Sequence, residues 1–119
     1  MTAVMVPTAG ATGGSGALAR NNRGHAVVVG GATSTLVSFV SGTFRLRGFH
    51  VYGETDGFAW IEVDSVPLDG LAARHSAVKD AYRILPNPEV YASPTSIVAL
   101  MVTNLSAGSA DFEGVILGE

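Results

Sequence analysis

Three histidines are the first residues whose chemistry has to be considered. They are evenly spaced, at His25, His50 and His75. Histidines that bind a metal come as near neighbours in the chain or at i, i+4 on a helix, and this chain has no cysteine to complete such a set. The spacing therefore indicates surface or strand histidines, and we expect neither a metal nor any other cofactor.

Catalytic motifs are equally scarce. The chain has no Gly-x-Ser-x-Gly turn for a nucleophilic serine and no phosphate-binding loop of the GxxxxGK type. "GSGALA", residues 14–19, is a degenerate dinucleotide-binding pattern, but no strand precedes it. Ser, His and Asp all occur, but a catalytic triad is defined by geometry and not by composition. We therefore expect that the protein is not an enzyme.

The charged and glycosylatable residues suggest no other site. Aspartate favours turns because it hydrogen-bonds the local backbone, and the acidic residues near turns do not follow the calcium-loop pattern. These residues are Glu54, Asp56, Asp64 and Asp69. Arg45 and Arg47 form a small basic spot, but on a chain of net charge −3 they indicate salt-bridge partners rather than a nucleic-acid site. Asn104, Leu105 and Ser106 form a glycosylation sequon, which has meaning only in a secreted protein.

Composition predicts a covered surface. Charged residues make up 14% of the 119 residues, against about 25% in an average soluble domain. The two long uncharged stretches, 26–44 and 90–110, are interrupted by Gly, Ser, Thr or Pro, and neither offers a membrane-spanning segment. The N-terminus has no secretory signal. We expect a protein made in the cytoplasm that contacts neither membrane nor nucleic acid and belongs to a larger assembly.

The elements that must position any site are strands. Residues 1–24 are rich in Gly, Ala and Thr and predict an extended N-terminal arm, whereas 25–119 read as one β domain. Short apolar runs separated by turn residues predict an all-β fold, a single antiparallel, jelly-roll-like β-sandwich of about eight short strands. The expected strands are 26–29, 34–40, 43–53, 58–66, 70–78, 80–85, 95–104 and 110–117. A short helix is the alternative for 70–85, and "LPNP", residues 85–88, predicts an ordered loop.

The region 43–66 reads as a hairpin. Its apolar alternation slips by one residue at Gly48, which predicts a β-bulge, and Asp56-Gly57 is a hairpin signal. The return strand alternates, so one face carries apolar residues and the other carries aromatic and acidic ones. The apolar face has Ala59, Ile61 and Val63, and the other face has Phe58, Trp60, Glu62 and Asp64. A later run, 97–102, is apolar on both faces and predicts a central strand covered twice.

Exposed aromatic residues are the candidate binding residues. Tyr52, Phe58 and Trp60 predict either a platform for a sugar or the anchor of a protein interface. Low charge elsewhere on the chain favours the interface.

Three segments resemble small β-sandwich virion proteins of tailed bacteriophages. They are "GFHVYGETDGFAWIEVDSVPL", "ASPTSIVALMVTN" and "SADFEGVILGE", which together lie within residues 43–119. The resemblance consists of a strand, an Asp-Gly turn and a second strand, a later apolar strand ending in "VTN", and a terminal strand from Phe112 to Gly118. It includes no catalytic signature.

The resemblance implies a non-enzymatic capsid decoration, or cement, protein. Such a protein is made in the host cytoplasm, binds the outside of the shell as a homo-oligomer, for instance a trimer, and clamps neighbouring subunits of the major capsid protein. The alternative is a carbohydrate-binding or tail-fibre accessory module that binds a glycan through exposed aromatics. We expect the partner interface to draw on a set of aromatic and basic residues: Tyr52, Phe58, Trp60, Arg45, Arg47, Arg20 and Arg23.

Overall fold

A computed structural model describes residues 22–76, 79–89 and 93–119. These residues form eight strands and no helix. The strands are β1 (Arg23–Val28), β2 (Thr33–Val40), β3 (Leu46–Gly53), β4 (Gly57–Val63), β5 (Val66–His75), β6 (Ala81–Glu89), β7 (Ile97–Asn104) and β8 (Ala110–Gly118).

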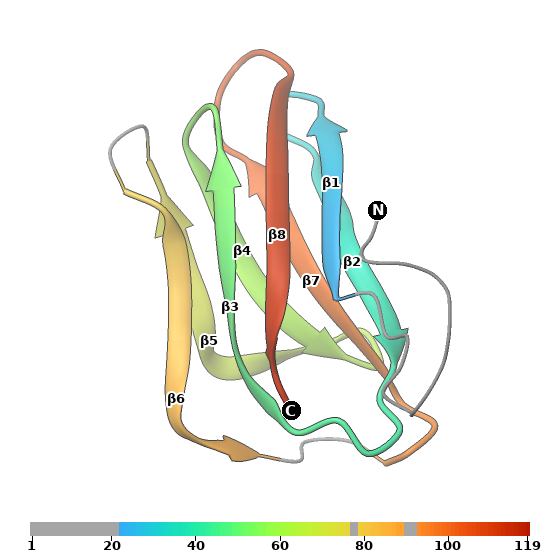
Figure 1. The fold of residues 1–119 in the computed structure, drawn as a ribbon. Helices are drawn as coiled ribbons and strands as arrows, with labels where there is room; N and C mark the ends of the chain where they lie inside the picture. The colour runs from blue at the N-terminus through green and yellow to red at the C-terminus, as the bar shows by residue number, and fades with distance from the viewer. Residues whose placement is uncertain (1–21, 77–78, 90–92) are drawn as a thin grey trace.

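The strands build two antiparallel sheets that pack face to face. One sheet has the order β1-β8-β3-β6 and the other has the order β2-β7-β4-β5, so most neighbours in the chain lie in different sheets (Figure 1). Eight strands divided in this interleaved order form a jelly roll. The predicted all-β sandwich is therefore confirmed, and the described residues of 70–85 belong to β5, β6 and part of their connection, without a helix.

Several boundaries differ from the prediction. The turn after β4 lies at Asp64 and Ser65, inside the predicted strand 58–66, so β5 begins at Val66 rather than at residue 70. Arg23 and Gly24, predicted as the end of the arm, belong to β1; residues 1–21 of that arm lie outside the described residues. The "LPNP" stretch is not a loop, because β6 continues through it to Glu89. β6 is an edge strand, and an edge tolerates proline because one side of the strand needs no hydrogen-bond donor.

The core lies between the sheets and follows the period-2 alternation of the strands. On β7 the inward residues Val98, Leu100 and Val102 are buried. Its outward residue Ile97 is exposed, so this strand is covered fully on one face only. The largest completely buried apolar side chains are Phe49, Phe112, Ile61, Leu71, Leu100 and Ile116.

The predicted hairpin between β3 and β4 is wrong. β3 pairs with β6 and β8, whereas β4 pairs with β5 and β7, so the Glu54–Asp56 connection crosses from one sheet to the other. Gly57 is a close-approach residue rather than a hairpin turn, since a Cβ there would lie 2.8 Å from the Phe112 ring. An Asp-Gly reversal at a sandwich corner has the same sequence pattern as a hairpin, which explains the error.

The predicted bulge at Gly48 is confirmed. The register of β3 shifts between Leu46 and Gly48 against both of its neighbours, and the buried phase moves to Phe49. A Cβ at Gly48 would collide with the Arg83 carbonyl oxygen and would lie 2.9 Å from the Ile84 Cα. Close approach of β6 therefore requires glycine at this position.

A tight turn joins β4 to β5. Asp64 and Ser65 have φ of 50° and 68°, as in a two-residue type I′ hairpin. The Ile97 backbone N–H donates to Asp64 Oδ1 at 2.9 Å, and the Asp64 N–H donates to the Ile97 carbonyl at the same distance. The turn is thereby held against the start of β7.

No helix among the described residues is long and apolar enough to span a membrane.

We predict that Gly48→Ala lowers the free energy of unfolding by about 3 kcal/mol, because the added Cβ overpacks the β3–β6 contact. Urea denaturation monitored by circular dichroism would measure the change. Gly108→Ala is the matched control, since nothing lies within 4 Å of a Cβ at Gly108. Equal stability of the two variants would contradict the steric role of Gly48.

Asp64 predicts a pH effect of defined sign. The Ile97 backbone N–H, followed by the Ser96 hydroxyl, lowers the pKa of the Asp64 carboxyl below its usual value. The carboxylate thus stabilises the fold above its unfolded-state pKa of about 3.9, and this contribution is lost as the pH falls through the lower, folded-state pKa. Asp64→Asn keeps an acceptor oxygen but does not titrate. We expect urea titrations to show that wild type loses stability relative to Asp64→Asn as the pH falls from 7 to about 2.5. A difference in stability that stays constant over this range would show that titration of Asp64 does not contribute to folding stability.

Candidate binding surface

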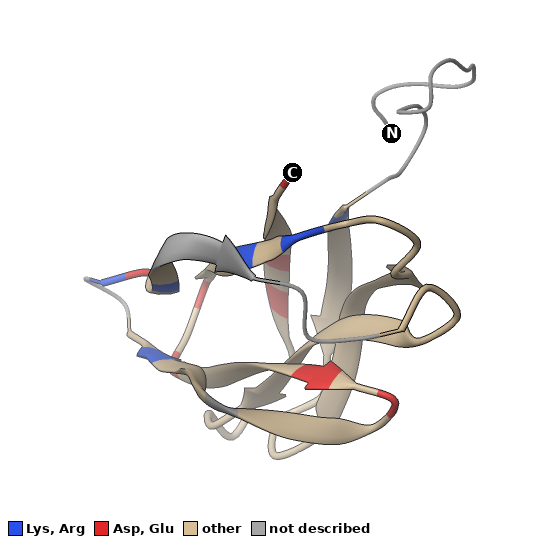
Figure 2. Cartoon of the chain, turned by 90° about the horizontal axis from the view of Figure 1, so that it is seen from below, with Lys and Arg blue, Asp and Glu red and all other residues tan. Residues whose placement is uncertain are grey.

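The outward side of the β2-β7-β4-β5 sheet, which we call the β4 face, is the least charged broad surface of the sandwich. Its strands contain three Asp, Glu, Lys or Arg residues, against six in the strands of the other sheet. Figure 2 shows long stretches of strand without a charged residue. Because protein interfaces are depleted of charge at their centre, this face is the better candidate for a covered surface.

Strand alternation places the aromatic residues on this face as predicted. Ala59 and Ile61 are completely buried in the core, so Phe58 and Trp60 point outward. Their ring centroids lie 5.9 Å apart with an interplanar angle of 34°. Hydrogen-bonded register sets Trp60 between Met101 of β7 and Ala72 of β5.

A large bulge in β5 raises a wall beside the aromatic pair. Trp60 pairs with Ala72 and Glu62 pairs with Pro67, so a step of two residues on β4 corresponds to five on β5. Gly70, with φ of 80°, turns the bulge, and Leu71 returns into the core. The extra residues stand next to Trp60 instead of continuing the flat sheet.

The bulge and the aromatic pair enclose an open groove of about 630 Å³, within the range of small-ligand sites. We call it the aromatic groove. Most of its lining is apolar. The lining residues are Phe58, Trp60, Pro67, Leu68, Gly70, Ala72, Arg74, Thr103 and Leu105.

Two polar side chains of the aromatic groove are hydrogen-bonded within the chain, and the exposed Arg74 faces a carboxylate. The Trp60 indole Nε1–H donates to Glu62 Oε2 at 2.8 Å, and the Thr103 hydroxyl lies 2.6 Å from the Thr33 hydroxyl. Arg74 Nη2 lies 3.7 Å from Asp56 Oδ2. An occupant would therefore gain contact mainly with apolar surface rather than new hydrogen bonds.

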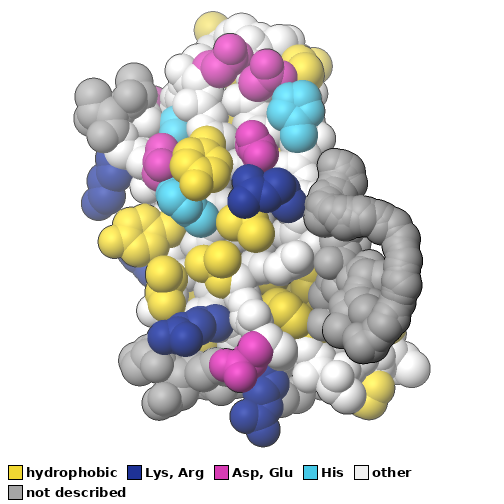
Figure 3. Space-filling view, viewed as in Figure 1, with side chains coloured by type: hydrophobic (Ala, Val, Ile, Leu, Met, Phe, Trp, Pro, Cys, Tyr) yellow, Lys and Arg dark blue, Asp and Glu magenta, His cyan; other side chains and the backbone are white. Residues whose placement is uncertain are grey.

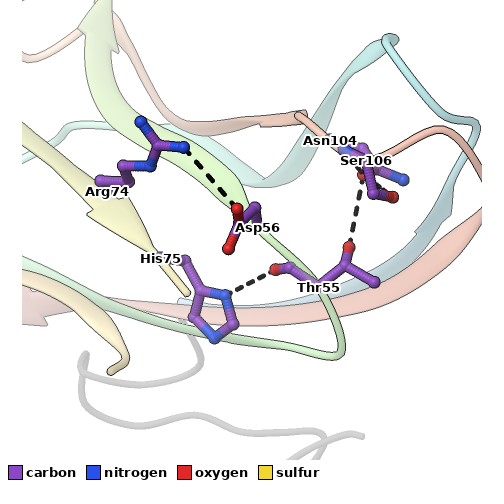
Figure 4. A network of polar contacts seen from close by, with 6 residues as sticks. All are labelled: Thr55, Asp56, Arg74, His75, Asn104 and Ser106. Carbon is purple, nitrogen blue, oxygen red and sulfur yellow. Dashed lines mark hydrogen bonds and ion pairs between the residues drawn. The ribbon is translucent and has the colours of Figure 1, made fainter. Parts of the chain in front are cut away.

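Asn104 positions one rim of the groove. It is completely buried, and its side-chain amide donates to the carbonyls of Val28 and Gly108, each at 2.8 Å. Its Oδ1 accepts from the Ser106 N–H and hydroxyl at 2.9 and 2.7 Å and from the Thr55 hydroxyl at 3.3 Å (Figure 4). With Asn104 turned inward, Thr103 and Leu105 on either side line the groove.

His75 positions the opposite rim. It is buried, its Nε2 accepts the Gly53 N–H at 3.0 Å, and its Nδ1 lies 2.7 Å from the Thr55 carbonyl, so Nδ1 carries the proton (Figure 4). The preceding residue, Arg74, consequently points outward, toward Asp56. Asn104 and His75, which position the two rims, therefore both bind Thr55 in the β3–β4 connection.

Asn104 of the predicted glycosylation sequon has a structural role in the fold. Asn104 has both amide hydrogens in internal hydrogen bonds and no exposed surface, so a glycan on this side chain is incompatible with the fold. Sequence reasoning missed Asn104 as a structural residue. The alternation of the strand could have revealed it, because Asn104 occupies the next inward-facing position after Val98, Leu100 and Val102.

The predicted interface residues do not form one surface. Tyr52 lies on the outward side of β3 in the other sheet, so it cannot share a platform with Trp60. Arg23 and Arg47 also belong to that sheet, and Arg45 precedes β3. Arg20 lies outside the described residues. Only Phe58 and Trp60 of the predicted set reach the groove, whereas Arg74, the β5 bulge and Leu105 were not anticipated because distant strands bring them there.

The opposite sheet carries charged, histidine and hydrophobic side chains side by side (Figure 3). His25 Nε2 lies 3.1 Å from Asp111 Oδ1, and Arg23 pairs with Glu113 at 3.0 Å. His50 Nε2 lies 3.1 Å from Asp80 Oδ2. In the part of the chain that the structure describes, no three metal-ligating side chains come together.

Comparison with known proteins finds no match to this chain among protein-family models, curated proteins or solved structures. A function for this chain is therefore argued from the geometry of the groove.

We predict that Asn104→Ala lowers the free energy of unfolding by about 3–5 kcal/mol, since it leaves backbone groups at the end of β1 and in the β7–β8 loop unpaired. Thermal and urea unfolding would measure it. Ser106→Ala is the matched control and should cost about 1 kcal/mol, because the Ser106 N–H still reaches Asn104. Similar losses in the two variants would show that Asn104 is not the residue that joins the loops.

Proposed function

We propose that this protein is a non-catalytic structural subunit that assembles with other protein through the aromatic groove. The observation that carries the proposal is an apolar groove built on strands, with the Trp60 indole and the Thr103 hydroxyl paired internally. Such a site offers apolar contact and shape and leaves no side chain poised for proton transfer or nucleophilic attack.

The groove has the composition of an interface anchor. Energetic centres of protein interfaces are enriched in aromatic residues that fill well-desolvated pockets, and Phe58 and Trp60 form the floor of this one. Strands position such anchors more rigidly than loops do. The low charge of the β4 face agrees with a surface that protein covers.

The assembly that we propose is the head of a tailed bacteriophage, with the protein on the outside of the shell as a decoration protein that clamps major capsid protein subunits. Support comes from the sequence resemblance and from the jelly-roll topology, which viral capsid proteins share. The topology argument is a fold-level analogy. Small interfaces repeated over a shell add up through multivalency.

Glycan binding is the second candidate, because lectins also use jelly rolls and the two rings at 5.9 Å could stack on a sugar. Its weakness is the shortage of free hydrogen-bond partners. A sugar in the aromatic groove would bury hydroxyls beside Trp60 and Thr103, whose polar groups are already hydrogen-bonded, which leaves Arg74 as the side chain able to donate to it. Unpaired buried hydroxyls are costly, so the geometry favours a protein occupant.

The test uses virions purified from cells that produce the protein, and virions from which its gene has been deleted. We expect wild-type protein to be present on the heads and to rebind the deleted heads in co-sedimentation. Phe58→Ala should bind at least about tenfold more weakly, because it removes the floor of the groove.

Tyr52→Ala is the matched control, since Tyr52 is 41% exposed and Phe58 is 40% exposed on opposite sheets. It should rebind like wild type. Absence of the protein from virions would refute the phage assignment. Glycan-array binding that Phe58→Ala abolishes, without any protein partner, would replace the structural proposal with the second candidate.

A further inference from the structure

We propose that the aromatic groove of one copy binds the N-terminal segment, residues 1–19, of a neighbouring copy. This inference rests on the proposed function, in which the groove docks protein, and it names the partner. The proposed contact would join copies into a homo-oligomer.

Charge distribution along the chain points to this occupant. Three long stretches lack Asp, Glu, Lys and Arg: residues 1–19, 24–44 and 90–110. The second stretch contributes to β1 and contains β2, and the third contains β7. Residues 1–19 are the remaining uncharged stretch, and an uncharged occupant suits a groove whose lining is mostly apolar.

The segment also has suitable apolar side chains. "AVMVP", residues 3–7, places Val4 and Val6 at alternate positions, and Pro7 disfavours a helix for the residue before it. In an extended segment Val4 and Val6 point to the same side and can both face Phe58 and Trp60. A groove of about 630 Å³ accommodates a few such side chains.

Geometry favours a neighbouring copy over the same chain. The sandwich begins at β1, the edge of one sheet, and β1 packs against β2, the far edge of the other sheet. The groove lies at the opposite side of that second sheet, between β4 and β5. A chain's own segment would have to cross the outward side of two strands, β2 and β7, before it reached Phe58 and Trp60. A segment from a neighbour can enter from the β5 edge of the sheet without this crossing.

Glycines in the segment supply the necessary reach. "GATGGSG", residues 10–16, has the composition of a flexible linker between the apolar residues and the sandwich. Each copy has one segment and one groove, so the contact is heterologous, and it closes into a ring when each copy passes its segment to the next.

The full-length chain provides its own reporter. Trp60 is the only tryptophan and lies in the groove, so its fluorescence and its quenching by acrylamide report directly on occupancy. Light scattering after size exclusion gives the mass in the same samples. We expect an oligomer in which Trp60 is shielded from the quencher. An excess of a synthetic peptide of residues 1–12 should dissociate this oligomer, while Trp60 stays shielded because the peptide occupies the groove.

The decisive variant is Val4→Asp/Val6→Asp, which puts charge into the segment without touching the sandwich. It should weaken association at least about tenfold and expose Trp60 to quencher. Thr12→Asp, in the glycine-rich part, is the matched control and should behave like wild type.

Either of two results would overturn the inference directly: the wild-type protein is a monomer with an exposed Trp60, or Val4→Asp/Val6→Asp leaves the oligomer intact. A third result would also overturn it: the wild-type protein is a monomer with a shielded Trp60, and Val4→Asp/Val6→Asp exposes that residue. This would mean that each chain fills its own groove. The proposed function fails separately, in the virion experiment. An oligomer that passes these tests but is absent from virions would refute only the phage assignment.

Discussion

The side chain of Asn104 is the constraint on which the binding surface depends. A buried amide must satisfy all of its hydrogen-bonding groups, and Asn104 does so by joining the end of β1, the β7–β8 loop and the β3–β4 connection. His75 meets the same connection from β5 through two backbone hydrogen bonds. These two inward side chains bring three connections to one end of the sandwich and thereby set where Arg74 and Leu105 stand at the rim of the groove.

Internal pairing of the rim also determines what the surface selects. Glu62 holds the indole of Trp60, Thr33 holds Thr103, and Asp56 faces Arg74. A groove whose polar groups are free would discriminate ligands by hydrogen bonding, as sugar sites do. With the indole and the Thr103 hydroxyl engaged, the proposed occupant would be selected mainly by shape and apolar contact.

Jelly-roll topology separates two outer faces of different composition. The interleaved strand order gives one sheet most of the charged and histidine residues, while the other sheet keeps the aromatic pair. The β5 bulge then converts part of a flat sheet into a groove, because its extra residues have no partner on β4 and must leave the sheet plane. Rigid strands and one irregular edge together make the site.

Sequence alone determined the elements, and tertiary structure decided their neighbours. Alternation of apolar and polar residues is a local property, so it correctly predicted the strands, the outward direction of Phe58 and Trp60, and the slip at Gly48. Pairing between strands depends on contacts between residues far apart in the chain, which local alternation does not encode. For that reason Asp56-Gly57 resembled a hairpin turn although it joins two sheets, Tyr52 looked like a neighbour of Trp60 although a core lies between them, and Asn104 showed only a sequon. The groove itself arises where β4, a bulge of β5 and the end of β7 meet, and only folding brings these three segments together.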